Sequence, residues 1–94
     1  MQKLPKDIID KIEQTYSLEQ RELVIEKLGS LWETELNVGE EQLARSILII
    51  ADGDMRKVEE IFETKFYRDP RDLIMYAASL SENKTYYGIE PFEK

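Results

Sequence analysis

Acidic side chains spaced three residues apart are the first features of this 94-residue sequence that could carry chemistry. On a helix this spacing places two carboxylates on one face, and carboxylate oxygens are the ligands that a hard cation such as Mg²⁺ prefers. The candidate pairs are Asp7 with Asp10, Glu19 with Glu22, Glu60 with Glu63, and Asp69 with Asp72. They raise the hypothesis of a metal-dependent enzyme that hydrolyses nucleotides.

Helical nucleotide pyrophosphatases hold Mg²⁺ with such pairs and also carry a Glu-x-x-Asp motif on a later helix, which this sequence lacks. Because the sequence contains 20 acidic residues, chance alone makes this spacing common. Asp69 and Asp72 also fit a helix start, and Glu60 and Glu63 fit a solvated face. We therefore expect no catalytic residue, no metal ligand and no cofactor. A metal-dependent nucleotide hydrolase using helix-borne carboxylates is kept as the alternative.

The sequence contains neither cysteine nor histidine, which removes most other catalytic devices. Without cysteine there is no disulfide, thiolate metal site or thiol nucleophile, and without histidine the commonest general base near neutral pH is missing. A Ser-Lys or tyrosine-based device stays open. The triplet Asp52-Gly53-Asp54 has its glycine at the wrong position for an EF-hand calcium loop, so we interpret it as a helix end followed by a helix cap.

Arg45 stands at the start of an apolar helical run, and a guanidinium near a core needs an acidic partner. The expected partners are acids at two later helix starts, Asp54, Asp69 and Asp72. Together with Arg71 they would form a polar cluster around Arg45. We interpret this cluster as structural and not as a ligand site.

Aromatic residues offer a second kind of site, because they are common anchors of binding surfaces. The candidate interaction anchors are Tyr67, Tyr86, Tyr87 and Phe92, although core or boundary packing is the commoner role for Tyr67. The other three lie in segment 81–94, where burial of apolar surface favours docking onto the chain's own helices over exposure to solvent. Docking onto another subunit stays open, and with it a homodimer.

Five short helices are predicted to position these residues, and each has its own start signal. The first begins near Pro5, and the second begins at Ser17, where Ser-Leu-Glu-Gln matches a capping box. Asn37, Asp54 and Asp69 are the predicted caps of the third, fourth and fifth helices, and a proline follows Asp69 directly.

The third helix is apolar all round at residues 47–50, so we expect it to be central. The predicted core faces are Leu4, Ile8, Ile9, Ile12 and Tyr16 on the first helix, Leu23, Val24, Leu28, Leu31, Trp32 and Leu36 on the second, and Val58, Ile61, Phe62, Lys65 and Phe66 on the fourth. The fifth helix should be well buried through Leu73, Ile74, Met75, Tyr76, Ala77, Ala78 and Leu80, and the outer face of the first should carry Lys6, Asp7, Asp10, Lys11 and Glu13. The sequence therefore predicts an all-α, compact single-domain bundle over residues 1–80 with a C-terminal aromatic tail at 81–94.

The formal net charge of −7 repels phosphate backbones, which argues against a nucleic-acid partner. It suits a basic protein partner, although it also helps to keep a small domain in solution. No apolar run approaches the roughly 20 residues of a membrane span, and the first residues lack the apolar core of a signal peptide. We therefore expect a cytoplasmic protein that does not contact a membrane.

Two runs and one valine carry a resemblance to a group of short bacterial all-helical proteins of unknown function. They are Leu43-Ala44-Arg45-Ser46-Ile47-Leu48-Ile49-Ile50-Ala51-Asp52-Gly53-Asp54, Val58, and Asp69-Pro70-Arg71-Asp72-Leu73-Ile74. The shared pattern is an arginine before an apolar helix, an Ala-x-Gly-Asp break and an Asp-x-Arg-Asp start to the next helix. The resemblance implies no activity and no functional residue, but it supports the predicted helix boundaries and the polar cluster.

The function that these observations favour is that of a non-enzymatic protein-interaction or accessory module, of the kind that immunity proteins represent. The motivation is the missing catalytic chemistry, the negative charge and the aromatic tail. On this hypothesis an acidic surface meets a basic protein partner.

Overall fold

The structure is a computed structural model that describes residues 4–33, 39–64, 69–81 and 92. These residues form five α-helices, α1 (Lys6–Thr15), α2 (Leu18–Gly29), α3 (Glu40–Ala51), α4 (Met55–Glu63) and α5 (Pro70–Leu80), with a short 3₁₀ helix η1 (Ser30–Glu33) after α2. No strand occurs in the described ranges. The prediction of a compact all-α bundle is confirmed.

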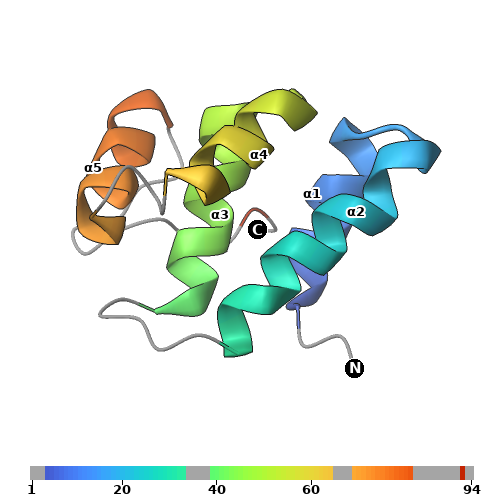
Figure 1. The fold of residues 1–94 in the computed structure, drawn as a ribbon, viewed down its shortest axis with the longest axis horizontal. Coiled ribbons are helices and arrows are strands. Elements are labelled where there is room, and N and C mark those ends of the chain that lie inside the picture. Colours follow the sequence, from blue (N-terminus) through green and yellow to red (C-terminus); the bar gives the residue numbers. More distant parts are fainter. Residues whose placement is uncertain (1–3, 34–38, 65–68, 82–91, 93–94) are drawn as a thin grey trace.

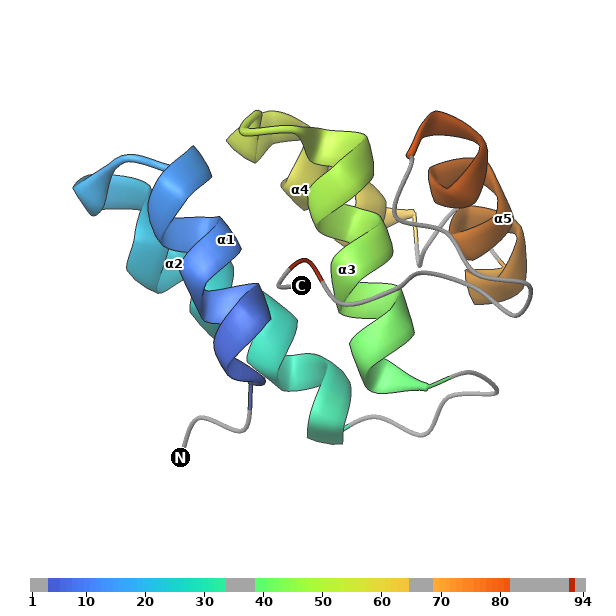
Figure 2. The ribbon, with the colours of Figure 1, turned by 180° about the vertical axis from the view of Figure 1, so that it is seen from behind.

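Helix α3 is the central element of the bundle. It packs against α1, α4, α5 and η1, and α2 packs against α1 and α4. The pair α1 and α2 lies on one side of α3, and α5 lies on the other (Figures 1 and 2). The apolar run 47–50 is therefore surrounded by other helices, as the sequence predicts. Within the described ranges no helix is both long and apolar enough to span a bilayer.

Local side-chain chemistry explains where α4 and α5 begin. The Asp54 carboxylate accepts a hydrogen bond from the Arg56 backbone N–H at 2.9 Å, and the Asp69 carboxylate accepts one from the Arg71 N–H at 3.0 Å. Each carboxylate satisfies an N–H that has no partner inside the helix. Both predicted caps are confirmed, as is Pro70 in the first turn of α5.

The outcome differs for the predicted caps of α2 and α3. Ser17 precedes α2 as predicted, but its exposed side chain makes no capping hydrogen bond, so the predicted capping box does not form. Gly39 directly precedes α3, whereas the predicted cap Asn37 lies outside the described residues. The third helix thus begins at Glu40.

The turn between α3 and α4 requires left-handed backbone. Asp52 ends α3 with a φ of +47°, and Gly53 follows with a φ of +88°. A Cβ atom at position 53 would lie 3.2 Å from Thr15 Cγ2, so the end of α1 closes against this turn. Glycine meets both the backbone and the space requirement here.

The core is built from the predicted apolar faces, and α3 contributes more buried apolar residues than any other helix. Its buried apolar side chains are Leu4, Ile8, Ile12 and Tyr16 around α1, Val24, Leu28 and Leu31 from α2 and η1, Leu43, Ala44, Ile47, Leu48, Ile50 and Ala51 from α3, Val58 and Ile61 from α4, and Leu73 and Ala77 from α5. Ile9, Trp32, Phe62, Ile74 and Ala78 are partly buried against it.

Four predicted burial assignments are wrong. On α2, Leu23 is 43% exposed, because the helix turns Val24 and Leu28 inward instead. On α5, Met75 is 71% exposed, and Tyr76 and Leu80 are also more than half exposed. This helix lies at the outside of the bundle and contacts α3, so only one narrow face is buried. Leu36, Lys65 and Phe66 lie outside the described residues.

Truncation of Leu28 should destabilise the fold far more than truncation of Leu23 on the same helix. Leu28 is fully buried and Leu23 is not. We expect Leu28→Ala to lower the free energy of unfolding by about 2–5 kcal/mol and Leu23→Ala to lower it by less than about 1 kcal/mol. Urea denaturation would measure both values, and equal losses would contradict the described packing of α2.

Candidate functional site

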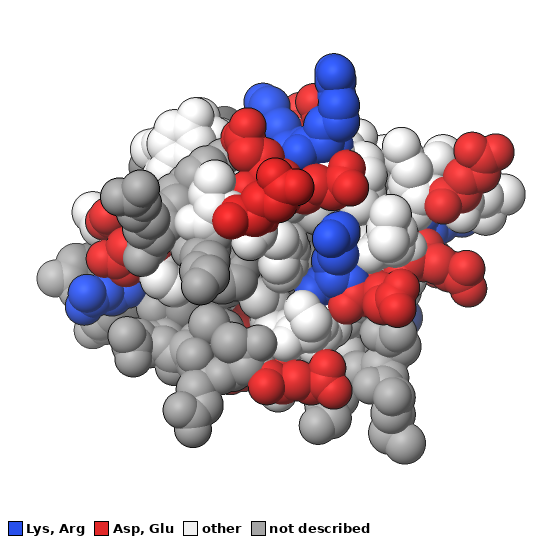
Figure 3. All heavy atoms as spheres, in the orientation of Figure 1, with Lys and Arg blue, Asp and Glu red and all other residues white. Residues whose placement is uncertain are grey.

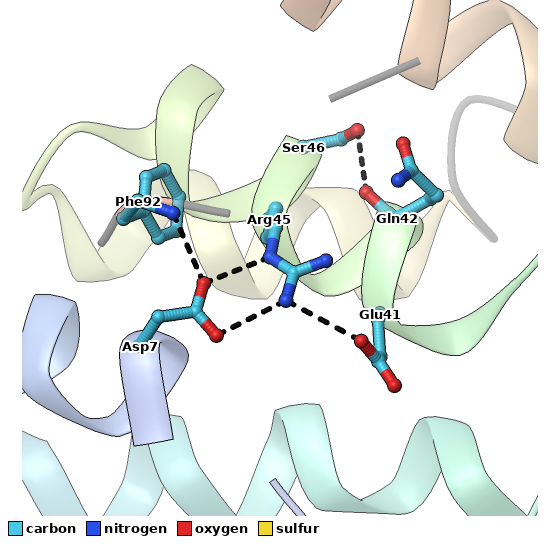
Figure 4. A network of polar contacts seen from close by, with 6 residues as sticks. All are labelled: Asp7, Glu41, Gln42, Arg45, Ser46 and Phe92. Carbon is cyan, nitrogen blue, oxygen red and sulfur yellow. Dashed lines mark hydrogen bonds and ion pairs between the residues drawn. The ribbon is translucent and has the colours of Figure 1, made fainter. Parts of the chain in front are cut away.

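The most specific arrangement of charged groups in the described residues is an ion pair between α1 and α3. Arg45 Nε donates to Asp7 Oδ2 at 2.9 Å, and Arg45 Nη2 donates to Asp7 Oδ1 at 3.0 Å (Figure 4). This two-pronged geometry is the strongest form of an arginine–carboxylate contact. Arg45 Nη2 also reaches Glu41 Oε1, one helical turn earlier, at 3.3 Å.

Both members of the pair are buried. The side chains of Arg45 and Asp7 are 6% and 8% exposed. Asp7 lies in the first turn of α1, where the helix dipole favours a negative charge. Arg45 lies in the first half of α3, beside Ser46, whose hydroxyl donates to the Gln42 carbonyl oxygen. The packing of α1 on α3 therefore brings together two residues that are 38 positions apart.

The pair stays ionised across the physiological pH range. The hydrogen bonds from Arg45 hold the pKa of Asp7 below its ordinary value of 3.8, although burial opposes them, and the backbone N–H of Phe92 lowers that pKa further. The same pairing raises the pKa of Arg45. A carboxylate that cannot take up a proton near neutral pH is a poor general acid or base. The geometry favours a structural and positioning role.

Phe92 contacts this pair from the C-terminal end of the chain. Its backbone N–H donates to Asp7 Oδ2 at 3.1 Å, and Lys11 Nζ lies 5.4 Å from the centre of its ring. The ring is partly buried against the core, and the residue lies beside Asp7 of α1. Of the four predicted anchors, Phe92 thus packs on the chain's own helices, whereas Tyr67, Tyr86 and Tyr87 lie outside the described residues.

The predicted partners of Arg45 are not the observed ones. The Asp54 and Asp69 carboxylates cap their own helices, and their ion pairs are with Arg56 and Arg71. Asp54 and Asp69 each act at the start of their own helix, and Arg45 pairs with Asp7 instead. The expected cluster of Arg45, Asp54, Asp69, Arg71 and Asp72 is therefore not observed around Arg45. A capping carboxylate accepts a hydrogen bond from a backbone N–H in the first turn of its own helix, and this local bond holds it there and not beside Arg45.

The sequence predicts Asp7 on the outer face of α1, and this assignment is wrong, because the side chain is buried. Asp7 directly precedes the fully buried Ile8, and adjacent residues on a helix lie only about 100° apart, so Asp7 borders the buried face. This adjacency is the sequence signal that indicates its place.

The carboxylate pairs considered for metal binding gain no support from the geometry. Among the described residues, no group of three or more acidic side chains lies close enough together to hold a metal ion. In the first pair, Asp7 is bonded to Arg45, and Asp10 forms an ion pair with Lys6 at 3.0 Å. In the last pair, Asp69 is a helix cap.

An open hollow of about 700 Å³ lies at the end of α3, the start of α4 and the end of α5, beside Lys11 of α1. It is lined by Lys11, Leu48, Ile49, Ile50, Asp52, Lys57, Leu80 and Ser81. Small-molecule sites usually enclose most of their ligand, and this wide hollow would leave a bound molecule largely in water. We therefore do not place the functional site there.

Tyr16 is a second buried polar group. Its hydroxyl has no hydrogen-bond partner of good geometry in the part of the chain that the structure describes. Burial raises the pKa of Tyr16 to about 12, the negative charges of Asp54 and Asp52 add to the rise, and the nearby backbone N–H of Gly53 partly offsets it. The phenol is thus a neutral packing group at the junction of α1 with the Gly53 turn.

Comparison of the sequence and the structure with known protein families, curated proteins and solved structures finds no match.

Asp7→Asn should strongly destabilise the protein at neutral pH, because it leaves the buried Arg45 charge without its carboxylate. We expect the free energy of unfolding to fall by about 3 kcal/mol, against less than about 1 kcal/mol for Asp10→Asn on the same helix. The folded-state pKa of Asp7 lies below its unfolded value of 3.8, so its contribution is present above about pH 4 and is lost as the pH falls through the folded value. The difference between wild type and Asp7→Asn should therefore shrink on acidification.

Urea denaturation at pH 7 and at pH 3 would measure both effects. A double variant, Asp7→Leu with Arg45→Met, removes both charges and should be more stable than Asp7→Asn alone. If the double variant is as unstable as Asp7→Asn, the instability of Asp7→Asn comes from lost packing and not from an unpaired charge.

Tyr16→Phe should leave the stability at pH 7 unchanged or slightly higher, because it removes a buried hydroxyl that has no partner of good geometry. The unfolded phenol ionises near pH 10 and the folded one near pH 12. The raised pKa therefore stabilises the wild type fully below pH 10, and this contribution is lost as the pH rises towards 12. Phenolate absorbance would show the late titration as a difference between the two proteins. A loss above about 1 kcal/mol at pH 7 would instead indicate a hydrogen-bonded hydroxyl.

Proposed function

We propose that this chain is a non-enzymatic protein-interaction module that binds a basic protein partner through the outer face of α2. The observation that carries the proposal is a set of exposed leucines among exposed glutamates on one side of that helix. We call this set the α2 outer face, and it consists of Leu18, Glu19, Glu22, Leu23 and Glu26.

Helix geometry places these five residues together. At about 100° per residue they share one side of α2, opposite the buried residues Val24 and Leu28. Leu18 is 78% exposed and Leu23 is 43% exposed, and the three glutamates are exposed as well. Exposed apolar area rimmed by polar residues is a common feature of protein–protein interaction sites, and this arrangement supports the proposal.

Neighbouring acids on α4 extend this surface. Helices α2 and α4 are in contact, and Glu59, Glu60 and Glu63 are exposed on α4. Asp and Glu side chains gather over both helices in Figure 3. A stable interface usually needs about 800 Å² from each partner, so one helix alone is too small and α4 would take part.

Charge and apolar area have different roles in the proposed contact. The net charge of −7 attracts a basic partner over a distance and speeds association. The leucines gain free energy only when the partner removes them from water. A partner that carries apolar side chains among lysines or arginines fits both requirements.

Reversal of one charge on the α2 outer face should weaken capture of this partner. We expect Glu22→Lys to reduce the amount of basic protein captured from a native extract at about 50 mM salt several-fold, and about 0.5 M salt to do the same for the wild type. Glu13→Lys on α1 is the matched control, because it changes the net charge equally at an exposed site outside this face. Quantitative mass spectrometry of the captured proteins would give the amounts.

Three outcomes would contradict the proposal: no captured protein at low salt, equal loss of capture by both variants, or capture that does not depend on salt.

A further inference from the structure

Phe92 occupies a site that three side chains of the bundle build. Asp7 accepts its backbone N–H, and Arg45 holds the Asp7 carboxylate in place (Figure 4). Lys11 lies over the Phe92 ring. The ring packs against the edge of the buried core. We call this arrangement of Asp7, Lys11 and Arg45 the Phe92 site.

Each contact in the Phe92 site recognises a general feature of a peptide. Asp7 binds a main-chain N–H, which every residue except proline supplies. Lys11 and the core edge bind an aromatic ring, through a cation–π contact and through apolar packing. None of these contacts requires that the bound residue belong to the same chain.

The acceptor of the Phe92 site is also organised before a peptide arrives. Two hydrogen bonds from Arg45 fix the orientation of the Asp7 carboxylate, and they use one lone pair on each oxygen. Oδ2 accepts the Phe92 N–H in addition to Arg45 Nε, so peptide binding does not break the ion pair. A group that is already oriented loses little freedom on binding.

We propose that the Phe92 site is a binding site for an aromatic peptide segment, and that the chain's own C-terminal segment is its resident occupant. A tethered segment has an effective concentration in the millimolar range, so it holds a site of modest affinity without a large contact area. An external peptide with the same features competes with Phe92 for the site. This site is distinct from the α2 outer face, and the proposal does not depend on the proposed function.

The test uses the full chain with Phe92→Ala, which removes the ring from the site and so weakens the tethered competitor, and a synthetic peptide of residues 88–94, Gly-Ile-Glu-Pro-Phe-Glu-Lys. The Arg45 Nε–H resonance reports directly on Asp7 and can be followed by NMR during the titration. We expect a saturable shift with a dissociation constant in the millimolar range. The wild type should bind the peptide about two- to tenfold more weakly, because its own Phe92 competes at an effective concentration similar to or above the dissociation constant.

Two matched controls identify the contacts. Lys11→Gln in the Phe92→Ala background should weaken peptide binding about two- to fivefold, because it removes the cation–π contact and leaves the buried ion pair intact. Asp10→Asn, on the same helix, should leave the affinity unchanged, as should Glu22→Lys on the α2 outer face. A peptide with alanine in place of its phenylalanine should not bind.

The proposal is overturned if the folded Phe92→Ala chain shows no saturable shift of the Arg45 resonance at several millimolar peptide. Equal affinity of the wild type and the Phe92→Ala chain would also overturn it, because the peptide would then bind elsewhere. So would equal binding of the alanine peptide, which would show that the ring is not recognised.

Discussion

The burial of one guanidinium constrains much of this fold. Arginine does not lose its proton in proteins, so Arg45 needs a carboxylate wherever the packing of α3 buries it. Asp7 meets that need with two hydrogen bonds and thereby fixes which turn of α1 lies against which turn of α3. Apolar residues in both positions could give similar stability, but they would not define the register of the two helices so narrowly. We infer that the pair contributes specificity more than net stability.

The same carboxylate connects three parts of the chain. Asp7 belongs to α1, binds Arg45 of α3 and accepts the backbone N–H of Phe92 near the C-terminus. Each of these contacts lowers its pKa, which suits a positioning group and not a proton donor or acceptor in catalysis. The chemistry of this site is therefore recognition of cationic and N–H donors.

Small size explains why the outer helices leave apolar side chains in water. A chain of 94 residues has a high ratio of surface to volume, and α3 contributes more of the buried residues than any other helix. Helices α2 and α5 each bury a narrow face and expose large apolar residues on the other side. The exposed leucines of α2 lie among glutamates, so a partner of opposite charge can match that surface. Nothing described around Met75 on α5 indicates what would cover that residue.

The sequence by itself determined the features that depend on contacts within one or two helical turns, which are the helix starts and the apolar character of each segment. The caps Asp54 and Asp69 could be predicted because each bonds an N–H two residues away, and the central place of residues 47–50 followed from their uniform apolar character. Only the tertiary structure decided the partner of Arg45, the exposure of Leu23 and the position of Phe92. These depend on how each helix is rotated against its neighbours, and apolar spacing defines that rotation only to within about one residue, or roughly 100°. An aspartate at the edge of an apolar face can therefore end up in water or in the core, and the packing of α1 on α3 decides which.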